Sequence, residues 1–135
     1  MPSPTVSRGL VLLVHGSRDR AWLEPFRRLR ELVAAQRPES TVVVACLQFC
    51  PPTLEEVFAE FATVGVRQVT VAPVFLSAGG HVNEDIPVRL RAVVRRHPGI
   101  EVELLPPLGD LPGALQAVAD CLVRAMNTAA APVTA

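Results

Sequence analysis

The stretch from residue 69 to residue 87, V-T-V-A-P-V-F-L-S-A-G-G-H-V-N-E-D-I-P, decides the fold. Its first half begins with β-branched residues and stays apolar to Leu76, which is typical of a buried parallel strand. Its second half turns polar after two glycines and then presents His81, Asn83, Glu84 and Asp85. Pro87 suits the first turn of a helix, so we expect Asp85 or a neighbour to cap a helix there. The stretch therefore predicts a strand, a polar loop and a helix, and such loops bind ligands in open α/β sheets.

The rest of the chain alternates the same two kinds of segment. Short β-branched or aliphatic runs predict strands at 9–14, 41–49, 66–76 and 100–105, the last with one solvent-exposed face near the sheet edge. Apolar residues at helical spacing predict helices at 22–36, from Thr53 to Gly65, at 86–97 and at 114–126. Thr53 and Glu56 form an S/T-x-x-E capping box at the start of the second helix.

This order, β-α repeated four times, predicts an α/β fold: a four-stranded parallel sheet with helices on both faces, a three-layer sandwich of the flavodoxin or Rossmann kind. We expect one domain over 9–127, an N-terminal extension over 1–8 and a flexible tail over 128–135. Parallel topology brings the loops after the first three strands to one edge, so His15 and His81 are expected to face one cleft.

Composition excludes several classes of function. The 135 residues are half apolar and carry a formal net charge of zero with dispersed basic residues, which argues against a nucleic-acid partner. No apolar run reaches the roughly 18 residues of a membrane span, and residues 1–8 lack the apolar core of a secretory signal. Three cysteines favour a reducing compartment, so we expect a cytoplasmic protein. Neither nucleotide-binding glycine motif occurs, which predicts no nucleotide cofactor.

Three motifs together carry a resemblance to a known family. They are L-V-L-L-V-H-G-S-R near the amino end, P-T-L-E-E after the second strand, and P-x-F-L-S-x-G-x-H-V-x-x-D-I-P in the middle. The chain resembles, over about residues 9–125, the small class II tetrapyrrole chelatases, which insert cobalt, nickel or iron into sirohydrochlorin for cobalamin, nickel-tetrapyrrole or siroheme biosynthesis. The resemblance implies ATP-independent insertion of Co²⁺, Fe²⁺ or Ni²⁺, a tetrapyrrole partner, and a homodimer with a cleft between subunits, as in the short members.

The residues fit that chemistry. Metal insertion requires two pyrrole protons to leave and a hydrated metal to exchange its ligands, and a neutral imidazole can serve either step. The resemblance implies that His15 and His81 are the catalytic and metal-binding pair, with their individual roles left open. Glu84 is a candidate proton relay, because Asp85 is equally plausible as a helix cap. Substrate carboxylates call for arginine forks and N–H donors; candidates on these loops are Ser17, Arg18, Gln48, Ser77, Gly79 and Gly80.

Gln48 departs from the family pattern, since many members have a glutamate at this point of the second strand. If the strand continues to residue 50, alternation places Cys46, Gln48 and Cys50 on one face, and Cys50 becomes a hypothetical soft metal ligand. The arginines at 89, 91, 95 and 96 are expected on a solvated helix face.

Two other functions would each explain part of the sequence. An acyl hydrolase would explain a strand ending in His15-Gly16, but the chain has no G-x-S-x-G elbow and is too short for that fold. A metal or tetrapyrrole carrier on the same scaffold stays open, because the amide of Gln48 can hold neither a proton nor a charge.

Overall fold

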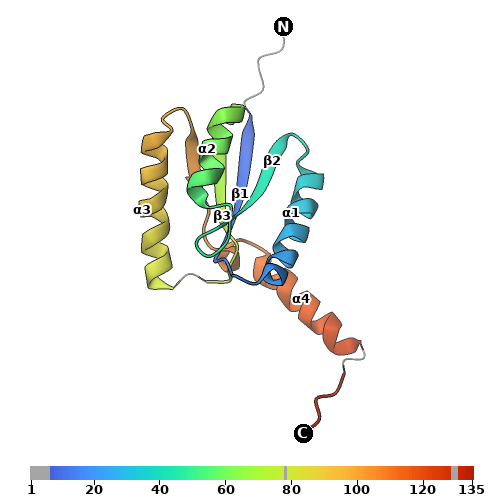
Figure 1. The fold of residues 1–135 in the computed structure, drawn as a ribbon. Coiled ribbons are helices and arrows are strands. Elements are labelled where there is room, and N and C mark those ends of the chain that lie inside the picture. The colour runs from blue at the N-terminus through green and yellow to red at the C-terminus, as the bar shows by residue number, and fades with distance from the viewer. Residues whose placement is uncertain (1–6, 78, 129–130) are drawn as a thin grey trace.

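The computed structural model describes residues 7–77, 79–128 and 131–135 and leaves out the side chains of residues 81–83. Four parallel strands form one sheet in the order β2-β1-β3-β4, as Figure 1 shows. The strands are β1 (Arg8–Val14), β2 (Ser40–Cys46), β3 (Gln68–Pro73) and β4 (Glu101–Leu104). The helices are η1 (Arg20–Leu23), α1 (Glu24–Gln36), α2 (Leu54–Val64), α3 (Gly80–Arg96), η2 (Leu108–Asp110) and α4 (Ala114–Asn127). The predicted α/β fold with a four-stranded parallel sheet and helices on both faces is confirmed.

Two hydrophobic clusters lie on the two faces of the sheet. The larger one joins β1, β2 and β3 to α2 and α3 through fully buried side chains such as Phe58 and Phe61. The smaller one packs η1 and α1 against the other face, with Leu23 buried against Val14 and Cys46. Because residues alternate between the faces of a strand, β1 supplies Val11 and Leu13 to one cluster and Val14 to the other.

Helix α2 begins and ends where the sequence predicts. Thr53 accepts a hydrogen bond from the Glu56 N–H at 3.1 Å, and the Glu56 carboxylate accepts one from the Thr53 N–H at 3.2 Å. Gly65 ends the helix in a left-handed conformation, with φ of 84°. The capping box therefore fixes the residue at which α2 begins after the loop that follows β2.

The start of α3 corrects the prediction of a helix over 86–97. The helix begins at Gly80 and contains Pro87 in its interior, so Asp85 is a helical residue and caps nothing. The physical reason is that no helix breaker lies between Gly80 and Pro87, and Ile86 and Leu90 bury the same face as the later turns. The polar residues after Gly80 thus belong to the first turns of a helix instead of a loop.

Strands β2 and β3 are shorter than the predicted 41–49 and 66–76. Strand β2 ends at Cys46, and an isolated bridge between Cys46 and Thr53 closes the loop that follows. Strand β3 ends at Pro73, which has no N–H for a ladder. The apolar residues beyond these ends therefore line the carboxyl edge without belonging to the sheet.

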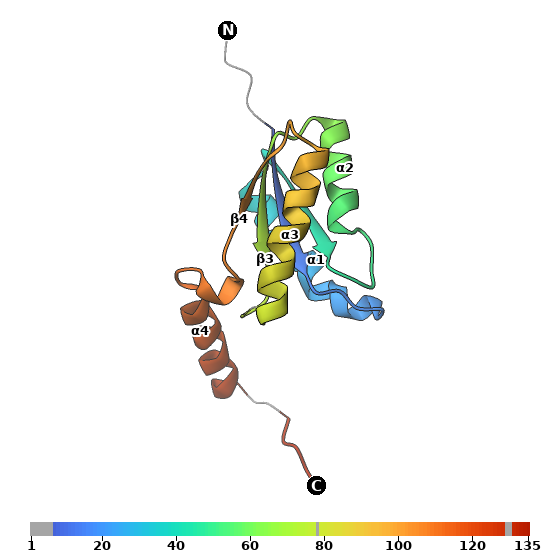
Figure 2. The same ribbon diagram turned by 90° about the vertical axis from the view of Figure 1, so that its left-hand side faces the viewer.

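Helix α4 forms over almost the predicted residues but covers no face of the sheet. Its side chains from Leu115 onward are exposed, and Figures 1 and 2 both show it extending beyond the ends of the strands. In the described part of the chain, no helix is long and apolar enough to cross a membrane.

Candidate active site at the carboxyl edge of the sheet

Backbone hydrogen bonds join the loops that leave the carboxyl ends of β1, β2 and β3. The Gln48 N–H donates to the His15 carbonyl oxygen at 3.1 Å, and the Leu47 N–H donates to Val14 at 2.9 Å. On the other side of β1, the Val74 N–H donates to Leu13 at 2.8 Å. These bonds continue the sheet pairing past the ends of the strands and place the three loops side by side.

Gly16 makes the contact between the first two loops possible. Its φ of +100° is disfavoured for residues with a side chain, and a Cβ atom there would overlap the carbonyl oxygen of Gln48. The glycine of the H-G-S-R motif therefore lets the loop after β2 lie directly against the residue that follows His15.

His15 lies exposed at the mouth of the site. Its ring stacks on Phe75 with centroids 4.5 Å apart and an interplanar angle of 30°. Beside it is an open hollow of about 270 Å³ between the β1 and β2 loops and α3, lined by His15, Leu47, Gln48, Asp85, Ile86, Val88 and Arg89. An imidazole, an amide, a carboxylate and a guanidinium thus share one cavity that is open to solvent.

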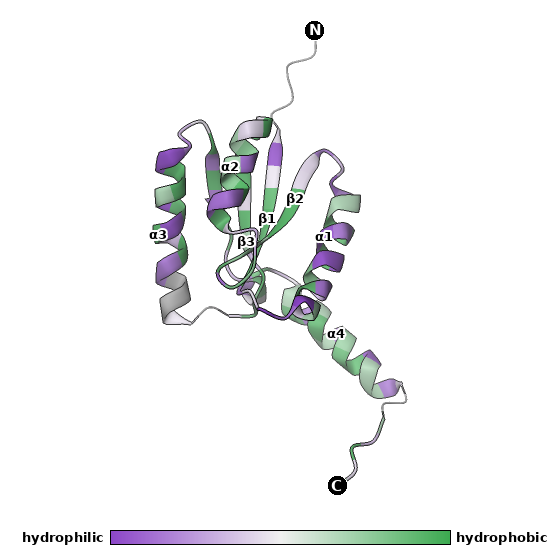
Figure 3. Cartoon of the chain, in the orientation of Figure 1, coloured by the Kyte–Doolittle hydropathy of each residue, from purple (hydrophilic) through white to green (hydrophobic). Residues whose placement is uncertain are grey.

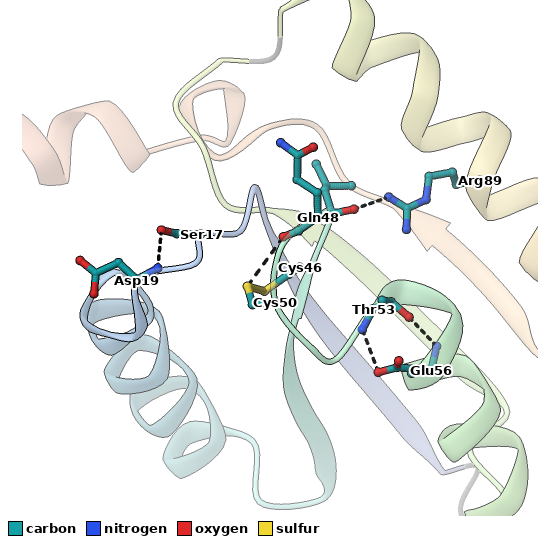
Figure 4. The surroundings of a disulfide bond; sticks show 9 residues. Ser17, Asp19, Cys46, Gln48, Cys50, Thr53, Glu56 and Arg89 are labelled. Atoms are coloured by element: carbon teal, nitrogen blue, oxygen red, sulfur yellow. Dashed lines mark hydrogen bonds between the residues drawn. A yellow bond between two sulfur atoms is a disulfide. The ribbon is translucent and has the colours of Figure 1, made fainter.

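Arg89 corrects the expectation of a solvated arginine face. Its Nη1 donates to the Leu47 carbonyl oxygen at 3.0 Å, while Nε and Nη2 hold both carboxylate oxygens of Glu55 at 3.0–3.2 Å. Figure 4 shows the guanidinium reaching the backbone beside Gln48. Arg89 therefore ties α3 and α2 to the loop after β2, whereas Arg91 is exposed as expected.

The contact with Arg89 changes the pKa of the Glu55 carboxyl group. Partial burial alone would raise the pKa of its carboxyl group, but the hydrogen bonds and charge of Arg89 outweigh burial and hold that pKa below its usual value. The Glu55 carboxyl group is therefore ionised near neutral pH where it meets Arg89.

Ser17 and Arg18 lie on the loop after β1. The Ser17 hydroxyl accepts a hydrogen bond from the Asp19 N–H at 3.0 Å, which shapes the entry into η1 (Figure 4). The Arg18 guanidinium lies over the ring of Phe49 at 4.7 Å, and Phe49 is 55% exposed with φ of 71°. Arg18 is thus held near the edge by a cation–π contact, with its charge open to solvent.

The loop after β3 supplies the remaining predicted residues. Ser77 and Gly79 are exposed, Gly79 is the N-cap of α3, and Gly80 is its first residue. His81 lies in the first turn of α3, and its side chain is outside what the structure describes. Glu84 is exposed and does not line the hollow that contains His15, whereas Asp85 does. Among the side chains that are described, no three histidine, cysteine or acidic residues gather at metal-binding distance.

Cys50 corrects another expectation. It forms a disulfide with Cys46, shown in Figure 4, because β2 ends at Cys46 and the turned loop brings residue 50 back to it. The predicted alternation of Cys46, Gln48 and Cys50 along one strand is wrong. A disulfide sulfur is no thiolate, so Cys50 in this form is not the soft ligand of the hypothesis.

Comparisons with known proteins identify the family of this chain. Residues 9–125 match the model of the CbiX family. The chain belongs to the CbiX family. Curated relatives of this CbiX chain include proteins named sirohydrochlorin cobaltochelatase. The one from Methanosarcina acetivorans is 32% identical over 83 residues, 62% of this chain and 64% of that one; the one from Methanopyrus kandleri is 36% identical over 81 residues, 60% and 57%. The matches thus span less than two thirds of those relatives.

Solved structures resemble this CbiX chain over most of its length. A CbiX protein named for cobalamin (vitamin B12) biosynthesis, from Marinobacter aquaeolei VT8, has a TM-score of 0.79 and 29% identity, covering 89% of this chain and 98% of that one. The sirohydrochlorin chelatase SirB from Bacillus subtilis, in complex with cobalt, has a TM-score of 0.74 at 22% identity, covering 87% and 50%. At that identity SirB shows the shared fold alone.

The sequence pattern does not identify Arg89 or Phe75 as parts of the site, and it leaves Asp85 open between a helix cap and a proton relay. Because α3 begins at Gly80, Asp85 lies within the helix and shares one face with Arg89, four residues later; the predicted start at residue 86 left Asp85 outside the helix. Phe75 lies two residues after the end of β3, and its apolar side chain fits the predicted strand over 66–76 equally well.

Proposed function

We propose that this CbiX protein inserts a divalent metal ion, Co²⁺, Fe²⁺ or Ni²⁺, into sirohydrochlorin or a related tetrapyrrole without ATP. The observation that carries the proposal is the exposed imidazole of His15, stacked on Phe75 at the rim of a hollow that also contains Asp85. An exposed imidazole next to a carboxylate can bind a hydrated metal or accept a pyrrole proton, and both events are needed for insertion.

The proposed roles divide between two elements. His15 directly follows the end of β1, and His81 comes from the first turn of α3, which starts at the same edge of the sheet. One histidine holds the incoming metal while the other accepts a pyrrole proton. Asp85 is the carboxylate that shares the hollow with His15, so it is better placed than Glu84 to pass that proton to solvent. Replacing Asp85 with Asn should slow insertion more than replacing Glu84 with Gln.

Cationic and N–H groups at the same edge suit a substrate that carries carboxylates. The exposed guanidinium of Arg18 and the free N–H groups at the start of α3, preceded by Gly79, provide positive potential without a buried charge. The Ser17 hydroxyl already accepts the Asp19 N–H, and its proton is left to donate to a substrate carboxylate.

We further propose that the protein works as a cytoplasmic homodimer. The hollow on one subunit is open on its solvent side. A planar macrocycle would therefore be half exposed on a single subunit, and a second subunit would close the cleft over it.

The test is an anaerobic turnover assay with purified protein, sirohydrochlorin and each metal in turn, followed by the absorbance change of the metallated product. Insertion faster than the uncatalysed reaction supports the proposal. Uncatalysed rates with all three metals contradict it.

A carrier function is the second candidate, favoured by Gln48 lining the hollow where a carboxylate would relay protons. The two functions differ in turnover. Tight sirohydrochlorin binding, measured by fluorescence quenching, combined with uncatalysed insertion rates favours the carrier.

A further inference from the structure

The Cys46–Cys50 disulfide closes the loop that carries Gln48 into the site, and Figure 4 shows the two together. Cys46 is the last residue of β2, and Cys50 follows it by four residues. Between them, Leu47 and Gln48 line the hollow beside His15. The disulfide itself faces α1, because Cys46 belongs to the smaller hydrophobic cluster and Cys50 packs against that cluster. One covalent bond on the α1 face therefore anchors a loop of the site.

The second half of this loop depends on the disulfide more than the first half does. The N–H groups of Leu47 and Gln48 donate to β1 and to the loop after it, at 2.9 and 3.1 Å. In the described part of the chain, the N–H groups of Phe49 and Cys50 donate to no backbone carbonyl. Phe49 also has φ of 71°, a left-handed conformation that is disfavoured for a bulky residue. The disulfide and the contact with Arg18 therefore hold the segment of Phe49 and Cys50 in place.

The two sulfur atoms of the disulfide differ in their access to solvent. Cys46 is 1% exposed, whereas Cys50 is half-buried, so a thiolate in solution reaches the Cys50 sulfur first. Cys46 lines a separate cavity of about 270 Å³ against α1, together with the guanidinium groups of Arg27 and Arg30 and the carboxylate of Glu31. Figure 3 shows hydrophilic residues recurring along α1 beside the hydrophobic carboxyl end of β2. Because neighbouring positive charge stabilises a thiolate, Cys46 suits the role of leaving group.

A disulfide at this place contrasts with the compartment that the sequence predicts. Three cysteines predict a reducing compartment, where most of the disulfides that form are transient, catalytic or redox-sensing. Partly exposed disulfides are also more easily reduced than buried structural ones. The remaining cysteine, Cys121, is exposed on α4 and has no part in the disulfide. The position of the Cys46–Cys50 bond is thus typical of a bond that opens and closes with the redox state of its surroundings.

We propose that Cys46 and Cys50 form a thiol–disulfide exchange site that sets whether the loop after β2 is held in the active site. The thiolate of a thiol reductant attacks the Cys50 sulfur and forms a mixed disulfide with it. The bond between Cys46 and Cys50 breaks, and its electron pair leaves on the Cys46 sulfur, which takes up a proton. A second thiol, from the same or another reductant molecule, then displaces Cys50, so the products are two cysteine thiols and an oxidised reductant.

Opening the disulfide changes the site through the backbone of the loop. Without the bond, Phe49 is free to leave its left-handed conformation, and the Gln48 carbonyl is free to move away from Gly16. His15 stays in place, because it directly follows β1 in the middle of the sheet. The oxidised protein should therefore bind a tetrapyrrole more tightly than the reduced protein does. This effect on substrate rests on the proposed function, whereas the thiol exchange and the loop motion do not.

The first test measures whether the disulfide exchanges. The C121S variant, which keeps Cys46 and Cys50, is equilibrated with graded mixtures of reduced and oxidised glutathione, alkylated with iodoacetamide and weighed by mass spectrometry. We expect no alkylated cysteine in the oxidising mixtures, two in the reducing mixtures, and one transition between them. A disulfide that survives the most reducing mixture, or two free thiols in the most oxidising one, overturns the proposal.

The second test measures what opening the disulfide does to the loop. Amide hydrogen exchange is followed by NMR in oxidised and reduced C121S, and C46A/C50A/C121S is the matched control that cannot form the bond. The Gln48 N–H reports on the loop, because it is bonded to the His15 carbonyl. We expect this N–H to exchange at least about tenfold faster in the reduced protein, and equally fast under both conditions in the control variant. Equal exchange in both forms of C121S, or a redox response of the control, overturns the switch.

Sirohydrochlorin binding to the two forms of C121S, measured by fluorescence quenching, connects the switch to the proposed function. The Kd should be severalfold lower for the oxidised protein, and the Kd of C46A/C50A/C121S should match that of the reduced protein. Equal Kd values for the oxidised and reduced forms overturn the control of the site by the disulfide. If thiol exchange and loop motion occur as expected but neither form binds sirohydrochlorin, only the proposed function is contradicted.

Discussion

The N–H of Gln48 donates a hydrogen bond to the carbonyl oxygen of His15 at 3.1 Å, beyond the last paired residues of β1 and β2. The residue in which this chain departs from the chelatase pattern is thus joined by its backbone to the residue that we propose as the metal ligand or base. Any change that separates these two loops should act on the site before it acts on the core.

Gly16→Ala tests that contact. The substitution places a Cβ atom against the Gln48 carbonyl oxygen and forces an unfavourable φ, and we expect it to lower the free energy of unfolding by about 2–4 kcal/mol. Gly65→Ala is the matched control, because Gly65 also has positive φ but its Cβ would meet nothing within 4 Å. It should cost only about 1–2 kcal/mol. Urea denaturation measures both, and equal losses would mean that the two loops are not in close contact.

Arg89→Gln should loosen the loop after β2 while the fold survives. It removes the donor to the Leu47 carbonyl and the three hydrogen bonds to Glu55, and because these groups are partly exposed we expect a loss of about 1 kcal/mol in stability. The KM for sirohydrochlorin should rise severalfold, since Gln48 and Leu47 line the hollow. Arg91→Gln, an exposed residue of the same helix, should change neither quantity. If Arg89→Gln and Arg91→Gln change stability and KM equally, Arg89 does not position the loop after β2.

Acid should abolish the contribution of the Glu55–Arg89 pair to the stability of the fold. The pKa of Glu55 is lower in the folded than in the unfolded chain, so the pair stabilises the fold above the ordinary glutamate pKa and loses that effect as the pH falls through the folded value. Between neutral pH and about pH 3, the urea midpoint of the wild type should fall further than that of Glu55→Gln. Parallel pH profiles would show that Glu55 is not paired in solution.

The architecture could be predicted from the sequence because it depends on features that are local in the chain. The aliphatic runs, the Thr53 capping box and the left-handed Gly65 each act within a few residues, and repeated β-α order then dictates a parallel sheet. The positions of His15 and Gln48 on neighbouring loops at one edge of the sheet follow from that topology.

Other parts of the site depend on tertiary contacts that no local pattern shows. The partner of Arg89 is 34 residues away, on α2, so helical periodicity alone assigned it to solvent. Pro87 predicts a helix start, because a proline in a helix interior removes a backbone hydrogen bond and is disfavoured there. Helix α3 nevertheless contains Pro87 in its interior. The apolar pattern of α4 predicted a helix correctly, but the same pattern would suit any covering partner, including one from a second chain.

Replacing His15 tests most directly whether this residue takes part in metal insertion. We predict that His15→Ala lowers kcat/KM for anaerobic metal insertion into sirohydrochlorin by at least about 100-fold, with an unchanged circular dichroism spectrum, because no other described side chain in the hollow is an imidazole. His97→Ala, which removes a histidine at the opposite end of α3, should keep wild-type turnover. Wild-type turnover in His15→Ala would contradict the account.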